Sequence, residues 1–225
     1  LIKDYYSGKN SGLIAEQWKA LPNYSSENEN ILVVADVSGS MTQGAGSVIP
    51  IHASIALGIY ASERNTGMFR DHFITFSTTP KLQKLSGNFP ERVRQLQTAE
   101  WGMSTDLQAV FNLILSQAIK YKVPANEMPT KVIIISDMEF NSCCVNSTNF
   151  ETISKKFNDS EYKIPSLIFW NVNGRPGNNP IKLKDKNVAL ISGYSPSVIP
   201  AILGDTINPM QIMLNTICKE RYAVI

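Results

Sequence analysis

The segment Asp-Val-Ser-Gly-Ser-Met at residues 36–41 places a carboxylate and two hydroxyls at alternating positions. In an extended or gently turning backbone, alternate side chains point to the same side, so Asp36, Ser38 and Ser40 would line one side of a loop. The pattern is weak by itself, because Asp, Ser and Gly are common turn residues and Ser is a common helix cap. A metal-binding interpretation therefore needs donors from other parts of the chain.

Two later segments offer such donors. Thr105 lies in Trp-Gly-Met-Ser-Thr-Asp at 101–106, and Asp137 lies in Ser-Asp-Met-Glu-Phe at 136–140. The set then consists of hard oxygen ligands without imidazole or thiolate, which suits Mg²⁺ or Mn²⁺ and, as an alternative, Ca²⁺. Because only the two carboxylates carry charge, a bound ion would stay electrophilic and keep a position open for water or an outside carboxylate. The predicted donors are Asp36, Ser38, Ser40, Thr105 and Asp137.

Four short apolar runs would form the strands that position these segments. The runs are 31–35, 131–136, 165–170 and 187–191. Short runs that are rich in β-branched residues and apolar on both faces are typical of strands buried between two layers of helices. The first run ends at Asp36 and the second at Asp137. Functional groups in open α/β sheets gather beyond the carboxyl ends of the strands, so we expect the donor segments to meet at one edge of the sheet.

The stretches between these runs have the periodicity of helices. Apolar residues at 106–120 follow the i, i+3, i+4, i+7 spacing of one helix face. At 51–63 isoleucines recur every fourth residue among small residues, which let a helix lie close on a sheet. A strand pair is expected at 72–77 and 81–85, and further helices at 13–21 and 210–221. This alternation predicts a mostly parallel α/β sheet that is covered on both faces.

The segment 36–41, followed in order by Thr105 and Asp137, resembles the von Willebrand factor A (vWA) domain and its metal-ion-dependent adhesion site (MIDAS). The resemblance covers roughly residues 30–205. It implies a doubly wound, Rossmann-like fold with a mostly parallel central sheet, helices on both faces and one antiparallel edge strand. It also implies that the five donors hold Mg²⁺ or Mn²⁺, some through water. An Asp or Glu carboxylate of a partner protein would then complete the coordination.

The details are most similar to the intracellular A domains of Ro-type (TROVE) proteins and of a related uncharacterised family. In both, the A domain follows a large helical region. One departure is Gly-Met-Ser-Thr at 102–105, where the family more often has Gly-x-Thr, so Ser104 is an alternative ligand to Thr105. Thr105 is preferred because Asp106 follows it, as in the family pattern. We expect residues 1–29 to be an N-terminal extension with a short helix and residues 30–225 to be the vWA-like domain, including a C-terminal helix.

Composition narrows the function classes. A net charge of +2, from 21 basic and 19 acidic residues, does not indicate a nucleic-acid binder. No apolar run reaches the roughly 18 residues of a membrane helix, so we expect no membrane association. Cys143, Cys144 and Cys218 cannot form a disulfide framework, which favours an intracellular, cytoplasmic location. Because position 1 is Leu rather than Met, we expect the sequence to be a piece of a longer protein.

Two alternatives to a binding module stay open. The first is Mg²⁺-dependent phosphoryl transfer or hydrolysis with Asp36 as the nucleophile. Against it, position 38 is Ser where dehalogenase-like phosphatases have a second acid, and no Lys follows Asp137 as in receiver domains. The second is an accessory domain of an RNA-binding protein, but in the Ro-type resemblance the RNA contacts belong to the helical region outside this sequence. We therefore predict a non-enzymatic, metal-dependent protein-binding module.

Overall fold

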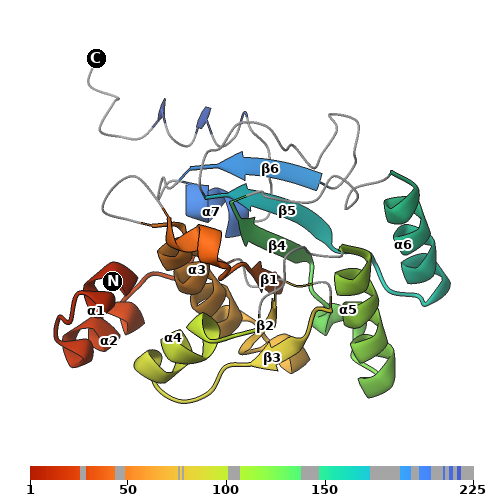
Figure 1. The fold of residues 1–225 in the computed structure, drawn as a ribbon. Helices are drawn as coiled ribbons and strands as arrows, with labels where there is room; N and C mark the ends of the chain where they lie inside the picture. Colours follow the sequence, from red (N-terminus) through yellow and green to blue (C-terminus); the bar gives the residue numbers. More distant parts are fainter. Residues whose placement is uncertain are drawn as a thin grey trace.

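The computed structural model describes most of the chain (Figure 1). The described residues are 1–25, 29–43, 49–75, 77, 79–100, 107–137, 147–172, 188–193, 198–203, 210, 213–214 and 217–218. Within these ranges no helix combines the length and the apolar character needed to cross a bilayer.

A mostly parallel sheet forms the centre of the described structure, with its strands in the order β3-β2-β1-β4-β5-β6 (Figure 1). The strands are β1 Ile31–Ala35, β2 His72–Thr75, β3 Leu82–Lys84, β4 Lys131–Ser136, β5 Ser166–Asn171 and β6 Val188–Ser192. β2 and β3 pair antiparallel, whereas the other neighbouring pairs are parallel. The order runs outward from β1 in both directions, as in Rossmann-like sheets. This confirms the predicted doubly wound, vWA-like fold class, including the antiparallel edge strand.

Helices cover both faces of the sheet (Figure 1). They are α1 Ile2–Tyr6, α2 Ser11–Lys19, α3 Pro50–Arg64, α4 Phe89–Gln97, α5 Leu107–Tyr121, α6 Ser147–Asp159 and α7 Val198–Leu203, with short 3₁₀ turns η1 Gly39–Thr42, η2 Gly67–Phe69 and η3 Ala125–Glu127. Successive strand residues point to opposite faces, so Val33 packs with α3 and α4 while Leu32 and Val34 pack with α5 and α6. Both faces of β1 are therefore buried, as its continuous apolar run predicts.

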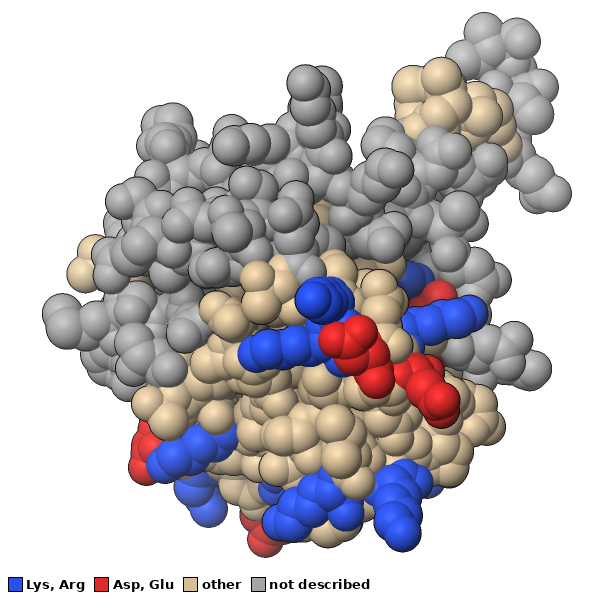
Figure 2. All heavy atoms as spheres, turned by 90° about the vertical axis from the view of Figure 1, so that its right-hand side faces the viewer, with Lys and Arg blue, Asp and Glu red and all other residues tan. Residues whose placement is uncertain are grey.

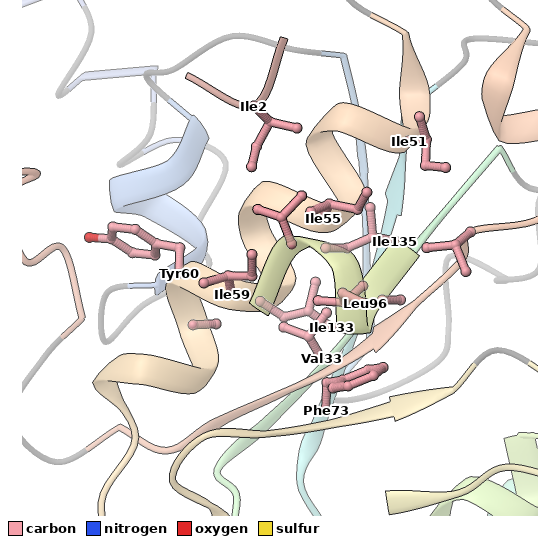
Figure 3. Close-up of a cluster of buried hydrophobic side chains, with 14 of the residues drawn as sticks. Ile2, Val33, Ile51, Ile55, Ile59, Tyr60, Phe73, Leu96, Ile133 and Ile135 are labelled. Carbon is pink, nitrogen blue, oxygen red and sulfur yellow. The ribbon is translucent and has the colours of Figure 1, made fainter. Parts of the chain in front are cut away.

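The α3 side of the core is built from branched aliphatic side chains. Figure 3 shows Ile55 and Ile59 of α3 and Leu96 of α4 lying over Val33 and Ile133 of the sheet. The cluster also takes in residues of α1 and α2, so the N-terminal helices share this core. The division into an extension at 1–29 and a domain at 30–225 stays a prediction.

Most predicted elements are present within two residues of their predicted bounds. β1 and β4 begin and end where predicted, β5 and β6 are each displaced by one residue, and α2 begins and ends two residues early. The terminal helix predicted at 210–221 falls mostly outside the described residues; in it, the N–H of Cys218 donates to the carbonyl of Leu214 at 2.8 Å. Helices α1, α4, α6 and α7 were not predicted.

Candidate metal centre

Asp36 directly follows β1 and is fixed in place by β4. Its side chain is only 2% exposed. Its N–H donates to the Ile135 carbonyl at 3.1 Å, which extends the parallel β1–β4 pairing by one residue. The Ser136 hydroxyl donates to Asp36 Oδ2 at 2.7 Å. The sheet register therefore orients this carboxylate before the following loop contributes anything.

The loop after β1 folds back onto the same carboxylate. The Ser38 N–H donates to Asp36 Oδ1 at 2.9 Å, an Asx-type turn that a short Asp-x-Ser segment favours. The Ser38 and Ser40 hydroxyls lie 3.0 Å apart, with Ser40 in the 3₁₀ turn η1. Both serines are only partly buried. The structure thus brings together the first three predicted donors on one side of the loop.

Asp137 follows β4 as Asp36 follows β1, and it too is only 2% exposed. Burial raises the pKa of the Asp36 carboxyl above its usual value. Hydrogen bonds from Ser38 and Ser136 lower this pKa, and the neighbouring charge of Asp137 raises it further. The charge of Asp137 therefore reaches the Asp36 carboxylate, as the positions of the two residues after adjacent parallel strands predict.

Part of the predicted donor set cannot be placed. Ser104, Thr105 and Asp106 lie outside the described residues, as does the rest of 101–106. The same holds for Cys143 and Cys144, whereas Cys218 is a free, exposed thiol. The contribution of the 101–106 loop to the site stays a prediction.

The described donors fit a hard divalent cation in their chemistry. In the described part of the chain, the groups that act on the Asp36 carboxylate are hydroxyls, an N–H and another carboxylate, with no Lys or Arg among them. No group of three or more His, Cys, Asp or Glu side chains is found in the same ranges. The candidate site has only two such side chains, Asp36 and Asp137, and its other donors are hydroxyls. Carboxylate and hydroxyl oxygens suit Mg²⁺ or Mn²⁺ better than zinc.

Ser136 is a site residue that was not among the predicted donors. It ends the apolar run 131–136 and pairs with Asn171 of β5, while its hydroxyl reaches the Asp36 carboxylate. The sequence shows a Ser before Asp137, but the contact with Asp36 depends on how β1 and β4 align. With Ala35 opposite Ile135, Ser136 comes to lie beside Asp36. Ser136 positions Asp36 and is no predicted ligand itself.

The chain is similar to a protein family of unknown function and to a viral protein. Residues 30–218 match the model of a domain of unknown function, DUF7788. The chain is 32% identical over 228 residues to the uncharacterized protein L728 of Acanthamoeba polyphaga mimivirus, a match that covers 96% of this chain and 39% of that protein. The chain therefore spans well under half the length of this relative.

Solved structures resemble the fold. The RO (RSR) protein of Deinococcus radiodurans matches with a TM-score of 0.57 and 17% identity, covering 83% of this chain and 36% of that chain. The SpRpn10 VWA domain matches with a TM-score of 0.46 and 10% identity, covering 78% of this chain and 93% of that chain. At 17% identity, the likeness to the RO protein concerns the fold alone.

Proposed function

The chain belongs to the DUF7788 family, and we propose that this member is a non-enzymatic protein-binding module whose buried Asp36 helps to hold a divalent cation. The cation would bridge to an Asp or Glu carboxylate of a partner protein. A vWA-like fold suggests an interaction module, but a fold by itself does not assign a function. The argument therefore depends on the residues at the edge of the sheet.

One observation carries the proposal: two carboxylates, Asp36 and Asp137, are buried at one sheet edge, where burial and the charge of Asp137 raise the pKa of Asp36. Buried charges are normally paired or coordinate metals, because desolvation without compensation is costly. No described cationic side chain acts on Asp36. A divalent cation would supply the missing compensation.

The chain's own residues prepare Asp36 for this role. Hydrogen bonds hold its two oxygens separately, one from Ser136 and one from the Ser38 backbone, so the carboxylate has a set orientation. The Ser38 and Ser40 hydroxyls would add neutral oxygens. When bound, Mg²⁺ or Mn²⁺, or Ca²⁺ as the alternative, supplies a Lewis-acidic position for an outside carboxylate. The proposed ligands are Asp36, Ser38, Ser40, Thr105 and Asp137, with Ser104 and Asp106 as accessory candidates.

The environment of Asp36 favours binding over catalysis. A nucleophilic carboxylate must reach the reacting atom of its substrate. Asp36 is 2% exposed, and both of its oxygens accept hydrogen bonds from the chain itself. We therefore propose that the chain is not an enzyme.

RNA binding by this chain has less support. Figure 2 shows basic and acidic side chains scattered among uncharged ones on the described part of one face, without a continuous basic patch. RNA contacts of a longer parent protein would then come from other parts of it. The intracellular location predicted from the cysteines also stays a proposal.

Calorimetric titration with Mg²⁺ and Mn²⁺ tests the metal centre. We expect Asp36→Ala and Asp137→Ala to abolish binding while the fold is kept, because both residues lie at the end of a strand. Asp159→Ala, an exposed carboxylate at the end of α6, is the matched control and should bind like the wild type. Unchanged affinity in both site variants would refute the site.

The partner's role needs a separate measurement. Crystals grown with Mg²⁺ and an acidic peptide should show an octahedral ion beside Ser38 with a peptide carboxylate among its ligands. Hydrolysis of a generic phosphate ester that is lost in Asp36→Ala would instead support the enzyme alternative.

A further inference from the structure

A pocket of about 580 Å³ opens among α2, the end of α3, the start of α4 and the turn before β2. Its volume falls within the range of small-molecule sites, about 300–1,000 Å³. Ala15, Trp18 and Phe89 form an apolar wall, and Arg64, Arg70 and Arg92 are among the polar residues of the remaining lining. The pocket therefore combines an apolar surface with strong hydrogen-bond donors.

Arg92 forms ion pairs with both acidic side chains of the lining. Arg92 Nη1 donates to Asp71 Oδ1 at 2.6 Å and to Glu63 Oε1 at 3.3 Å. Glu63 Oε2 also accepts from the Trp18 indole N–H at 2.8 Å. Both acidic residues of the lining are thus already engaged within the wall of the pocket.

Arg64 and Arg70 do not form such close ion pairs in the described part of the chain. Arg64 donates to the backbone carbonyls of Tyr60 and Leu21 at 3.1 and 3.3 Å, and its guanidinium lies 3.5 Å from the Tyr60 ring centroid. Its nearest carboxylate oxygen, on Glu63, is 4.0 Å away, at the limit of an ion pair. Arg70 is exposed, and it forms no ion pair with any acidic side chain in the described ranges.

The charge of the lining indicates the charge of the ligand. The lining has three arginines and two carboxylates, and its one lysine, Lys19, is neutralised by Glu16 outside the lining at 2.8 Å. The surplus is one positive charge. A monoanion would balance it, whereas a phosphate dianion would place a second negative charge near Glu63 and Asp71. Arginine binds the planar carboxylate group well through paired N–H donors.

We infer that this pocket binds a carboxylate carried on an apolar group. Arg64 and Arg70 take the carboxylate, and the wall of Ala15, Trp18 and Phe89 takes the apolar part. The ligand is either a free organic acid or an acidic side chain beside a hydrophobic residue in a peptide. The chemistry is the same in both cases.

This pocket is separate from the candidate metal centre. Asp71 immediately precedes β2, which runs parallel to β1, so the pocket lies at the amino-terminal edge of the sheet. Asp36 lies at the carboxyl-terminal edge, about 15 Å away along a five-residue strand. Binding here is expected without any metal ion, and it does not depend on the proposed function.

Titration of the ¹⁵N-labelled chain by NMR in EDTA at pH 7 tests this inference. With 4-phenylbutyrate we expect the Trp18 indole N–H signal and the backbone amide signals of residues 87–89, 91 and 92 to shift. The neutral amide of this acid and phenyl phosphate should each bind about tenfold more weakly or worse. Acetyl-Gly-Phe-Glu-Gly-amide and its Gln counterpart form the peptide arm, and tighter binding by the Glu peptide than by 4-phenylbutyrate identifies a peptide source.

Variants connect the binding to the arginines. Arg64→Gln and Arg70→Gln should each weaken 4-phenylbutyrate binding about tenfold, whereas Arg94→Gln, an exposed arginine of α4 outside the lining, should not. Arg64 also has structural contacts, so the exposed Arg70 is the variant that isolates binding. Absence of a Trp18 shift with both 4-phenylbutyrate and the Glu peptide, equal affinity for the neutral amide, tighter binding of phenyl phosphate, or unchanged affinity in Arg70→Gln would overturn the inference.

Discussion

The Ser136 hydroxyl donates a 2.7 Å hydrogen bond to Asp36 Oδ2, joining the ends of two parallel strands that are 100 residues apart in sequence. Both side chains are buried, at 1% and 2% exposure. The bond depends on the register that puts Ala35 opposite Ile135. The central sheet, and not only the loop that follows β1, therefore sets the direction of the Asp36 carboxylate.

Removing this hydroxyl tests its two roles. Ser136→Ala should lower the free energy of unfolding by about 1.5–3 kcal/mol, because a buried carboxylate loses a hydrogen bond. Loss of a group that orients a ligand should also weaken Mg²⁺ binding about 10–100-fold. Urea unfolding and calorimetry measure the two effects.

A buried serine elsewhere provides the control for that variant. The Ser62 hydroxyl donates to the Ile59 carbonyl within α3, at 2.9 Å, and does not contact Asp36. Ser62→Ala should leave Mg²⁺ affinity unchanged. If both alanine variants bind Mg²⁺ like the wild type, Ser136 does not position Asp36 for a metal.

Neutralising Asp36 should stabilise the metal-free protein. Asn at position 36 can accept from the Ser38 N–H through its oxygen and donate to Ser136 through its amide, while the repulsion from Asp137 disappears. We expect Asp36→Asn to raise the free energy of unfolding in EDTA by on the order of 1 kcal/mol. With Mg²⁺ at 100 times its Kd the wild type should gain about 2.7 kcal/mol and the variant nothing. A variant that is less stable in EDTA would contradict this account.

The same carboxyl gives a pH dependence of known sign. Its pKa is raised in the folded state, chiefly by burial, so the folded chain binds this proton more tightly than the unfolded chain. The stabilisation is complete below the unfolded pKa, near 3.8, and is lost as pH rises through the higher folded pKa. In EDTA, the wild type should therefore lose stability relative to Asp36→Asn over this interval. A stability difference that is flat with pH would show that Asp36 is not under electrostatic strain.

The central strands could be predicted because burial on both faces leaves a direct signal in the sequence. β1 and β4 are continuous β-branched runs, and each ends at the carboxylate that the site uses. Their convergence followed from a general rule on parallel sheets. The Ser136–Asp36 contact could not be predicted in this way. Strand register depends on packing across the whole sheet, and the sequence of a single strand does not determine it.

α4 was missed although a local signal is present. Asn88 caps this helix by accepting from the Glu91 N–H, and the Glu91 side chain accepts from the Asn88 N–H in return. This capping box, with Pro90 in the first turn, marks a helix start. The helix has few apolar residues, so a search for apolar periodicity alone passes over it. Because the pocket lies at the start of this helix, the sequence pattern did not predict the pocket either.

His52 should make the stability fall in mild acid. Burial lowers the pKa of its imidazole, Lys3 lowers it further, and the ring stacks on Tyr6 with centroids 5.3 Å apart. The unfolded chain then binds this proton more readily, so stability should decrease as pH falls below about 6.5 towards the lower folded pKa. His52→Phe keeps an aromatic ring against Tyr6 and should flatten the curve between pH 7.5 and 5.5. An unchanged slope in this variant would assign the effect to other groups.

Close packing of α3 on the sheet should make Gly58 intolerant of a side chain. A Cβ at this position would lie 2.8 Å from Leu96 Cδ1 and 3.8 Å from the Ala35 Cβ. Alanine improves helix propensity by about 0.5–1 kcal/mol, but overpacking a tight core costs about 1–3 kcal/mol. We expect Gly58→Ala to destabilise the chain by about 1 kcal/mol in urea unfolding.

A double-mutant cycle identifies the side chain that resists the added methyl group. Leu96 is fully buried, and the Leu96 methyl is the atom that an added Cβ would meet first. Leu96→Val shortens it and should itself cost about 1 kcal/mol. Because the shorter side chain makes room, the double variant should be more stable than the sum of the two single effects predicts, by about 0.5 kcal/mol or more. Additive effects would mean instead that α3 moves away from the sheet as a whole, carrying the strain to Ala35, the residue that precedes Asp36.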